Sequence, residues 1–329
     1  SSIFSVVAVS LKKKLARKLT NRDGALLALG AYLLMVYGVQ ASRNFQPDPL
    51  MVSLMAAAWW AFYSWREKPT WKWAVIAGLI SGLAIFVKNS VVFFLAIPYA
   101  IVVLERGWKI AIKDKQTWLV GFLTIAPAIG YTIYGTYIAG FLNQQFNFRV
   151  FPSLWIELAN YSRWFKQVQD TAGLPALLLG LIGIPFFAAV RPLRFILGIW
   201  LGYVVYGLTF AYHIGTHDYY QLPFLVVLSL SMASVGQHLM LSWKNWHPNR
   251  LWKYLPFIAA ILMVMAGFWS GRLQLLKDDY RNEPVFWRSL GDRLRDYPVI
   301  GLTQDYGYRM SYYGWDTIEN WQGSGDLAL

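Results

Sequence analysis

Long apolar runs, separated by short clusters of basic residues, dominate the pattern along most of the chain. The runs occupy residues 1–11, 25–40, 50–65, 73–87, 91–104, 118–138, 174–190, 195–212, 222–241 and 255–269. Several are shorter than the ~20 residues that a straight membrane-spanning helix needs, so their boundaries are soft. The pattern predicts an all-α polytopic membrane protein with about nine to ten transmembrane helices, the first of them truncated at its N-terminal side.

The pattern changes after residue 270, where polar residues become frequent. Residues 284–297 have apolar positions at helical spacing, and residues 298–303 have the pattern of a short buried strand before a turn. We therefore expect a transmembrane module at 1–270. We expect 271–329 to be the start of a small extracytoplasmic α/β domain that the chain does not complete.

Composition places the chain outside the soluble class. Of its 329 residues, 57% are hydrophobic and only 14% are charged, whereas soluble domains have roughly 45–50% and 25%. The net charge of +13 comes from clusters between the apolar runs, so it indicates membrane topology rather than a nucleic-acid partner. There is no cysteine, which excludes disulfides and thiolate chemistry.

The distribution of the basic residues predicts the orientation. One set of alternate loops contains 18 lysines and arginines, and the opposite set contains 5. Because positive residues are enriched in short cytoplasmic loops, the richer set is expected to be cytoplasmic. Asp48, Lys88, His213, His217 and Asp218 then all lie on the extracytoplasmic side.

Asp48 lies between two prolines in the polar turn Arg43-Asn44-Phe45-Gln46-Pro47-Asp48-Pro49. Pro49 should keep Asp48 out of a helix and suits the first turn of the helix that follows. Asp48 is then either an ordinary helix cap or an acid held rigidly at the membrane surface for chemistry. In the second case it would activate a hydroxyl acceptor or orient a divalent metal ion.

Lys88 interrupts a long apolar region, and a charge in such a position is costly. It either extends its ammonium group to the interface or binds an anionic headgroup as a point charge.

The segment 213–223 is the densest polar turn on the same side. His213 and His217 could share a metal ion only on a helix, and Gly215 and Thr216 argue against one, so no metal ligand is assigned. Tyr219 and Tyr220 are either interfacial aromatic residues or, with His217, hydrogen-bond donors to a phosphate.

The loop at 140–173 mixes aromatic and basic residues, Arg163 among them. This composition suits a helix that lies in the headgroup layer, and it suits an ordinary connector equally well.

Three short motifs, in this order, resemble the GT-C integral-membrane glycosyltransferases. They are Arg43 with Pro47-Asp48 before an apolar run, the glycine-containing stretch 78–84 that leads to Lys88, and His217-Asp218-Tyr219-Tyr220-Gln221-Leu222-Pro223. The likeness extends over most of residues 1–270. It is greatest to the bacterial relatives of dolichyl-phosphate-mannose protein mannosyltransferases, which include the aminoarabinose transferases.

The resemblance implies inverting transfer of a sugar from a polyprenyl-phosphate donor to a hydroxyl acceptor. It implies a multi-pass protein of the plasma (inner) membrane with an extracytoplasmic active site. Asp48 matches the second acidic position of the family. Lys88, His217, Tyr219, Tyr220 and Arg43 would bind the donor phosphate, with Asp218 and Arg163 as further candidates. The principal catalytic acid of the family would lie upstream of Ser1.

Two other classes of protein remain as alternatives. A transporter or lipid flippase for an anionic lipid would favour inverted repeats and polar residues at mid-membrane, and the sequence has neither. A membrane scaffold without chemistry would leave Asp48 as a cap and Lys88 as an interfacial charge. Activity lost on replacing Asp48 or Lys88 would separate the enzyme from both.

Overall fold

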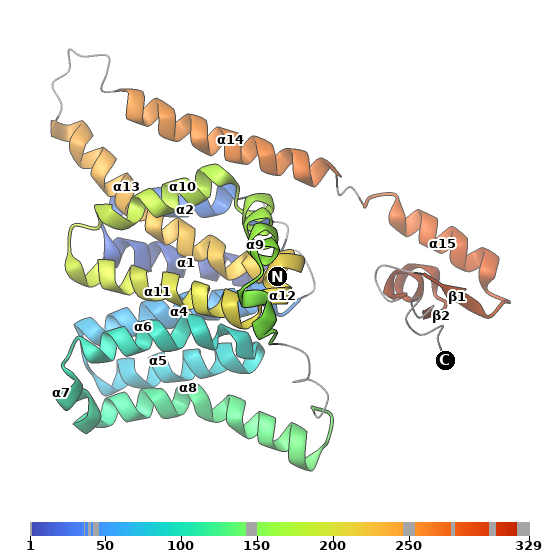
Figure 1. Cartoon of the computed structure of the whole chain (residues 1–329), viewed down its shortest axis with the longest axis horizontal. Coiled ribbons are helices and arrows are strands. Elements are labelled where there is room, and N and C mark those ends of the chain that lie inside the picture. The colour runs from blue at the N-terminus through green and yellow to red at the C-terminus, as the bar shows by residue number, and fades with distance from the viewer. Residues whose placement is uncertain are drawn as a thin grey trace. The chain divides into compact units, whose positions relative to one another are not determined.

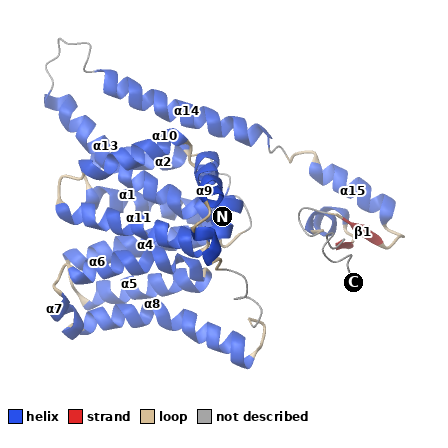
Figure 2. Cartoon of the chain, viewed as in Figure 1, coloured by secondary structure: helices blue, strands red, loops and turns tan. Residues whose placement is uncertain are grey.

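The computed structural model describes residues 2–35, 37–38, 41, 46–142, 150–245, 254–277, 280–302 and 307–320. The chain divides into two compact units, Ser1–Arg272 and Leu273–Leu329 (Figures 1 and 2). The described α-helices of the first unit include α1 (Ser2–Leu19), α2 (Arg22–Leu34), α4 (Asp48–Glu67), α5 (Trp71–Val87), α6 (Val92–Leu104), α7 (Trp108–Lys113), α8 (Lys115–Ile133), α9 (Leu158–Thr171), α10 (Leu174–Gly183), α11 (Val190–Thr209), α12 (Ala211–Thr216), α13 (Leu222–Asn245) and α14 (Leu255–Lys277), the last running into the second unit. A helix therefore forms in each of the predicted apolar runs.

Apart from α14, the long helices of the first unit lie side by side, and α9 crosses their direction (Figure 1). Neighbours in sequence pack together, as α1 does with α2 and α4 with α5. Helices far apart in sequence also pack together: α2 against α13, and α6 against α11. These long-range pairs bring the segment after residue 210 beside the N-terminal helices.

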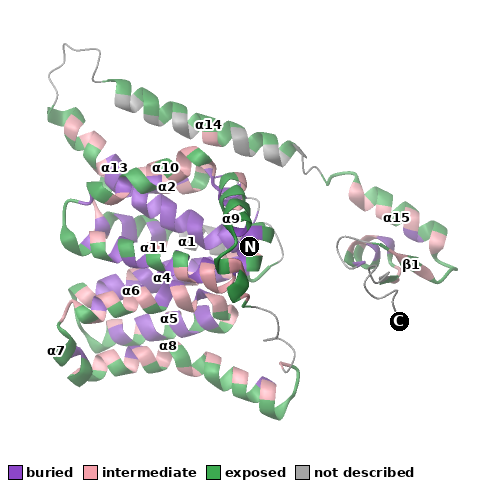
Figure 3. Ribbon diagram, viewed as in Figure 1, coloured by how far each residue is buried: buried purple, intermediate pink, exposed green. Residues whose placement is uncertain are grey.

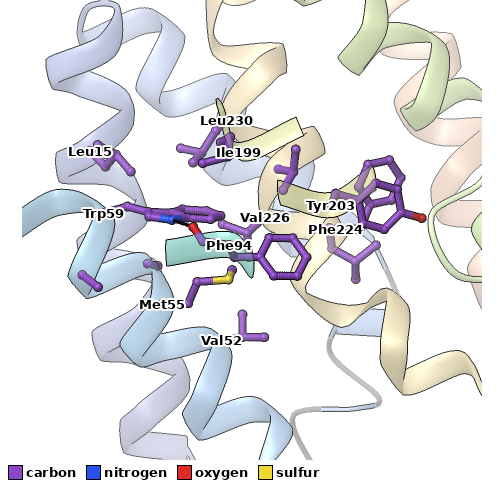
Figure 4. Packing of buried hydrophobic residues seen from close by; sticks show 14 of the residues in the cluster. Leu15, Val52, Met55, Trp59, Phe94, Ile199, Tyr203, Phe224, Val226 and Leu230 are labelled. Carbon is purple, nitrogen blue, oxygen red and sulfur yellow. Dashed lines mark hydrogen bonds between the residues drawn. The ribbon is translucent and has the colours of Figure 1, made fainter. Parts of the chain in front are cut away.

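The core of this unit is built on α4 and α13, whose residues are buried over most of their length (Figure 3). Large side chains fill the space between the helices, with Trp59 and Phe94 in contact at 6.5 Å between ring centroids (Figure 4). The indole of Trp59 donates a hydrogen bond to the carbonyl of Phe94 at 2.7 Å. Fully buried aromatic residues with a satisfied donor hold α4 and α6 in one fixed arrangement.

Small residues allow α5 and α8 to approach closely. A Cβ atom at Gly82 would lie 2.2 Å from the carbonyl oxygen of Leu123, and one at Gly78 would lie 2.7 Å from the Leu123 side chain. Two small residues four positions apart form a typical contact surface between membrane helices. The glycine-containing stretch before Lys88 is therefore a packing surface.

Three helical segments in the described part of the chain are long and apolar enough to cross a membrane, namely Lys115–Ile138, Val190–Thr209 and Asp218–Asn245. A fourth arises if Leu158–Thr171 and Leu174–Phe186, bent by 97°, count as one span. An all-helical membrane protein agrees with this result. The predicted nine to ten spans stay a prediction.

One end of the bundle carries a set of ion pairs. Arg66 at the end of α4 pairs with Glu105 after α6 at 2.5 Å, and Arg106 pairs with Asp114 at 3.1 Å. Lys18 pairs with Glu67. The sequence predicts that this end is cytoplasmic, because its loops contain most of the lysines and arginines.

The second unit contains α15 (Glu283–Leu294), the strands β1 (Val299–Gly301) and β2 (Ile318–Asn320), and the π-helical turn η7 (Met310–Gly314). The two strands pair in parallel, with Val299 opposite Ile318. α15 and β1 occur where the sequence predicted a helix and a strand. An α/β domain built from them, with its boundary at residue 270, stays a prediction.

Candidate functional site

Asp48 and Lys88 form an ion pair at the opposite end of the bundle. Because α4 and α5 are consecutive antiparallel helices, the first residue of α4 lies beside the residue that follows α5. The Nζ atom of Lys88 lies 2.6 Å from Oδ1 of Asp48. The Asp48 side chain is 4% exposed and the Lys88 side chain 20%, so the pair is largely withdrawn from water.

The expectation that Asp48 stays outside the helix is wrong by one position. α4 begins at Asp48, and Pro47 before it already has helical backbone angles, φ −70° and ψ −17°. The fixed φ of proline suits a first helical turn, so Pro47 starts the helix earlier than Pro49 alone would. Pro47, not Asp48, occupies the cap position, and Asp48 has Lys88 as its partner.

Lys88 also faces two tyrosines from a distant part of the chain. Its Nζ atom lies 4.8 Å from the ring centroid of Tyr219 and 5.1 Å from that of Tyr220. Both tyrosines belong to the 3₁₀ helix η5 (Asp218–Gln221), which precedes α13. A cation this close to aromatic faces is attracted to them, so the tyrosines hold the ammonium group beside Asp48.

The segment around His213 is helical, contrary to the sequence-based expectation. α12 spans Ala211–Thr216, because Gly215 allows α9 to pack closely and the Thr216 hydroxyl bonds the carbonyl of Tyr212 at 2.8 Å. The rings of His213 and His217 are 5.6 Å apart. The Nδ1 atom of His217 lies 2.8 Å from the Thr216 hydroxyl.

His217 joins the same cluster through aromatic contacts. Its ring lies 5.4 Å from Tyr219 and 6.0 Å from Tyr220. Tyr220 stacks in turn on Tyr206 of α11 at 5.7 Å. The structure thus brings Asp48, Lys88 and the turn at 217–220 together.

Two tyrosines of the cluster, Tyr37 and Tyr206, were not predicted as site residues from the sequence. The hydroxyl of Tyr37, after α2, hydrogen-bonds Asp218, and Asp48 is near enough to act on it electrostatically. Asp48 also acts electrostatically on Tyr206. Both tyrosines lie in apolar runs, where a tyrosine is ordinary, and only the packing of α2 and α11 reveals them.

A chain of hydrogen bonds from α9 and α11 holds the turn at 217–220 in place. The indole of Trp164 on α9 donates to the hydroxyl of Tyr203 at 2.6 Å, and that hydroxyl donates to Oε1 of Gln221 at 2.7 Å. Nε2 of Gln221 then donates to the carbonyl of Ile214 at 3.0 Å. Gln221 is fully buried and has partners at both amide atoms, so η5 has a defined position.

One predicted site residue, Arg163, stands apart from this cluster. The Arg163 side chain on α9 is about half exposed, and its ion-pair partner is Glu157 at 4.0 Å. Arg43 lies outside the described residues. Within the described ranges, no group of three or more His, Asp or Glu side chains is arranged to hold a metal ion, so none is assigned as a metal ligand.

These features define a helical membrane protein with a polar, charged site at one end of its bundle. Residues 1–134 match the family model of dolichyl-phosphate-mannose-protein mannosyltransferase, which agrees with the GT-C resemblance of the first two motifs. No curated protein matches the chain.

The matched part contains Asp48 and Lys88 but ends before the turn at 217–220. The match supports a membrane glycosyltransferase that uses polyprenyl-phosphate sugar donors in general. Lys88, which lies in the matched part, contacts Tyr219 and Tyr220, so the turn at 217–220 packs against that part.

Proposed function

We propose that the full-length protein transfers a sugar from a polyprenyl-phosphate donor to a hydroxyl acceptor at the extracytoplasmic face of the plasma membrane. The observation that carries this proposal is the Lys88–Asp48 pair under the paired tyrosines, at the end of the bundle poor in positive charge. The bond between the anomeric carbon and the phosphate oxygen breaks, a bond from that carbon to the acceptor oxygen forms, and the proton of the acceptor hydroxyl passes to water. The polyprenyl phosphate leaves with added negative charge.

Lys88 has the chemistry to stabilise this leaving group. A fixed ammonium group in a site largely closed to water interacts strongly with a charge that develops next to it. His217, Tyr219 and Tyr220 would donate hydrogen bonds to the phosphate oxygens, with Arg43 and Arg163 as further cations.

Asp48 would then have two tasks in succession. Before the donor binds, it holds the ammonium group of Lys88 in position. Once the phosphate competes for Lys88, the Asp48 carboxylate is free to orient the acceptor hydroxyl. Asp218 has its partner in Tyr37, which places it beside these groups. We assign no catalytic base to any of them.

The position of the charged groups favours this function over a transporter or flippase. Transporters bind their substrates near the middle of the membrane, often at broken helices. Here Asp48 begins a helix, Lys88 ends one and the turn at 217–220 precedes one. All three are helix termini at the same end of the bundle.

The test is sugar transfer by membranes that contain Lys88→Gln or Asp48→Asn. We expect each variant to lose at least about a hundredfold in rate, the usual loss when one electrostatic group of an active site is removed. Lys72→Gln is the matched control, since Lys72 is exposed at the other end of the bundle. Wild-type turnover in both site variants, at equal amounts of inserted protein, would defeat the proposal.

A further inference from the structure

A long apolar groove lies between α6, α7 and α8. Its volume is about 840 Å³, within the range of small-molecule sites. Tyr99 and Val103 line it from α6, and Gly121, Ile125 and Ile129 line it from α8. It starts at the end of the bundle that carries the ion pairs, because it takes in the C-terminal half of α6, whereas Lys88 precedes α6.

The length of the groove corresponds to one leaflet of a bilayer. From Trp118 to Gly130 it follows thirteen residues of α8, about 18 Å of helix. Half the hydrocarbon core of a bilayer is about 15 Å thick. Trp108 and Trp118 at its polar end are 60% and 63% exposed, as is usual for tryptophans at the membrane interface. An acyl chain that enters at the tryptophans would fill the groove.

The positive charge at the polar end of the groove favours a lipid with an anionic headgroup. Lys109 and Lys113 on α7 and Lys115 at the start of α8 are exposed. Within the described ranges none of the three has an ion-pair partner, whereas Arg106 beside them is paired with Asp114. Three uncompensated cations within seven residues complement a phosphate-bearing headgroup.

A second groove shows the opposite arrangement. It measures about 450 Å³ and lies between α2, α13 and α14, with Asp23 as its charged lining residue. Asp23 is itself paired with Lys244 at 3.8 Å. This groove provides an internal comparison, since it has apolar walls and the charged residue in its lining is an acid.

From the groove and the lysines we infer a binding site for an anionic glycerophospholipid. One acyl chain lies in the α6–α7–α8 groove, and the headgroup phosphate lies on Lys109, Lys113 and Lys115. The lipid would belong to the leaflet opposite the Asp48–Lys88 site. It would therefore be distinct from the sugar donor, and its binding does not depend on the transfer reaction.

The test counts lipids that the purified full-length protein retains. The protein is reconstituted into nanodiscs with equal parts of phosphatidylcholine and phosphatidylglycerol, released into detergent, and analysed by native mass spectrometry. We expect retained phosphatidylglycerol in the wild type. Each lysine near an anionic headgroup contributes about a fivefold change in affinity, so Lys109→Gln/Lys113→Gln/Lys115→Gln should reduce retention more than tenfold. Lys13→Gln/Lys68→Gln/Lys72→Gln, which removes three exposed lysines at the same end, is the matched charge control.

Filling the groove tests the acyl-chain part separately. Gly121→Leu should reduce retention to the level of the lysine variant, because a side chain at Gly121 meets only the Tyr99 hydroxyl at 3.6 Å and can extend into the groove. Gly30→Leu in the second groove is the control, since a Cβ atom there meets nothing within 4 Å. Ala126→Leu replaces Gly121→Leu if the latter does not fold.

Three results would overturn the inference. Equal retention of both lipids by the wild type would mean an unselective annular layer. Normal retention in Gly121→Leu and Ala126→Leu would mean that the lysines attract lipid without the groove. Retention of a polyprenyl phosphate in place of phosphatidylglycerol, when both are supplied, would make the groove part of the donor site.

Discussion

At the scale of single residues, the main feature is a buried pair of opposite charges. Asp48 is 3% exposed, and a carboxylate so far from water is costly unless a cation neutralises it. Lys88 supplies the cation, and Tyr219 and Tyr220 confine it. The sequence also allowed two simpler interpretations, a helix-capping aspartate and a lysine that only extends to the membrane interface. Neither of them accounts for this contact.

The pair predicts different effects of single and double substitutions on stability. Lys88→Met should lower the free energy of unfolding by about 1–3 kcal/mol, because it leaves the Asp48 carboxylate buried without its partner. Asp48→Asn/Lys88→Met removes both charges and should recover most of that loss while activity stays absent. Thermal unfolding of the purified variants, combined in a double-mutant cycle, measures the coupling. A double variant less stable than Lys88→Met would contradict the pairing.

Tyr37 provides a second prediction at this scale. Tyr37→Phe keeps the ring and removes the hydrogen bond to Asp218, which is worth about 0.5–1.5 kcal/mol. We expect transfer activity to fall about threefold to tenfold with little change in the amount of inserted protein. Tyr32→Phe is the control, since the Tyr32 ring contacts Lys12 at 3.1 Å and would keep that contact. Equal activity of Tyr37→Phe and the wild type would remove Tyr37 from the site.

At the scale of elements, α9 is the helix that connects the surface of the bundle to the Asp48–Lys88 site. It bends by 97° relative to α10, and it packs against α12 and η5. If α10 crosses the membrane, α9 lies parallel to the membrane surface, as a helix in the headgroup layer would. Ile156 and Leu158 before and at its start are 90% and 84% exposed, which suits contact with lipid. Its Trp164 connects through Tyr203 to Gln221 of η5.

This link predicts that displacing α9 impairs the donor turn. A Cβ atom at Gly207 on α11 would lie 2.1 Å from the Trp164 ring, so Gly207→Val should push Trp164 away and break the first bond of the chain. We expect the KM for the lipid donor to rise several-fold, with a smaller effect on kcat, because η5 loses its support and Lys88 stays paired. Steady-state kinetics measure this split.

The matched control for that variant is Gly30→Val, which adds the same atoms to α2 where a Cβ atom meets nothing within 4 Å. If Gly207→Val and Gly30→Val had the same KM, α9 would not position the turn. A loss confined to protein amount, with unchanged kinetics, would give α9 a role in folding alone.

At the scale of the whole molecule, the two ends of the first unit differ in charge. One end holds the ion pairs of Arg66 and Arg106 and the lysines of α7, and the other holds Asp48 and Lys88. Positive charge gathers on the cytoplasmic side of membrane proteins, so the first end should face the cytoplasm. The site would then face outward, where a lipid-linked sugar donor would be used.

The orientation can be measured cleanly because the chain has no cysteine. Asn89→Cys, next to Lys88, should react with a membrane-impermeant maleimide added outside intact cells. Lys72→Cys should react only after permeabilisation, since it is exposed at the other end of the bundle. Arg295→Cys reports on the second unit and should behave like Asn89→Cys. Labelling of Lys72→Cys from outside would reverse the proposed orientation, and the cysteine-free parent shows background labelling.

Much of this architecture was predictable from the sequence. Apolar runs predicted where helices form, since a segment with few polar side chains satisfies its backbone in a membrane only as a helix. α15 and β1 followed from the spacing of Val285, Phe286, Leu290 and Leu294 and from the short run at 298–303. The helical state of α12 did not, because Gly215 disfavours a helix locally and only the packing of α9 makes a small residue useful there.

The sequence by itself determined that this chain is helical and membrane-bound, and which residues are unusual enough to suspect. An unpaired charge such as Asp48 or Lys88 is conspicuous in apolar surroundings because burying it alone is costly. Tertiary structure decided that these two charges are partners, since they are forty residues apart and meet through the antiparallel packing of α4 and α5. The tertiary structure also places Tyr37, Tyr203 and Gln221 in the same site. Side chains of these types are common throughout the sequence, so only their packing contacts show that they take part.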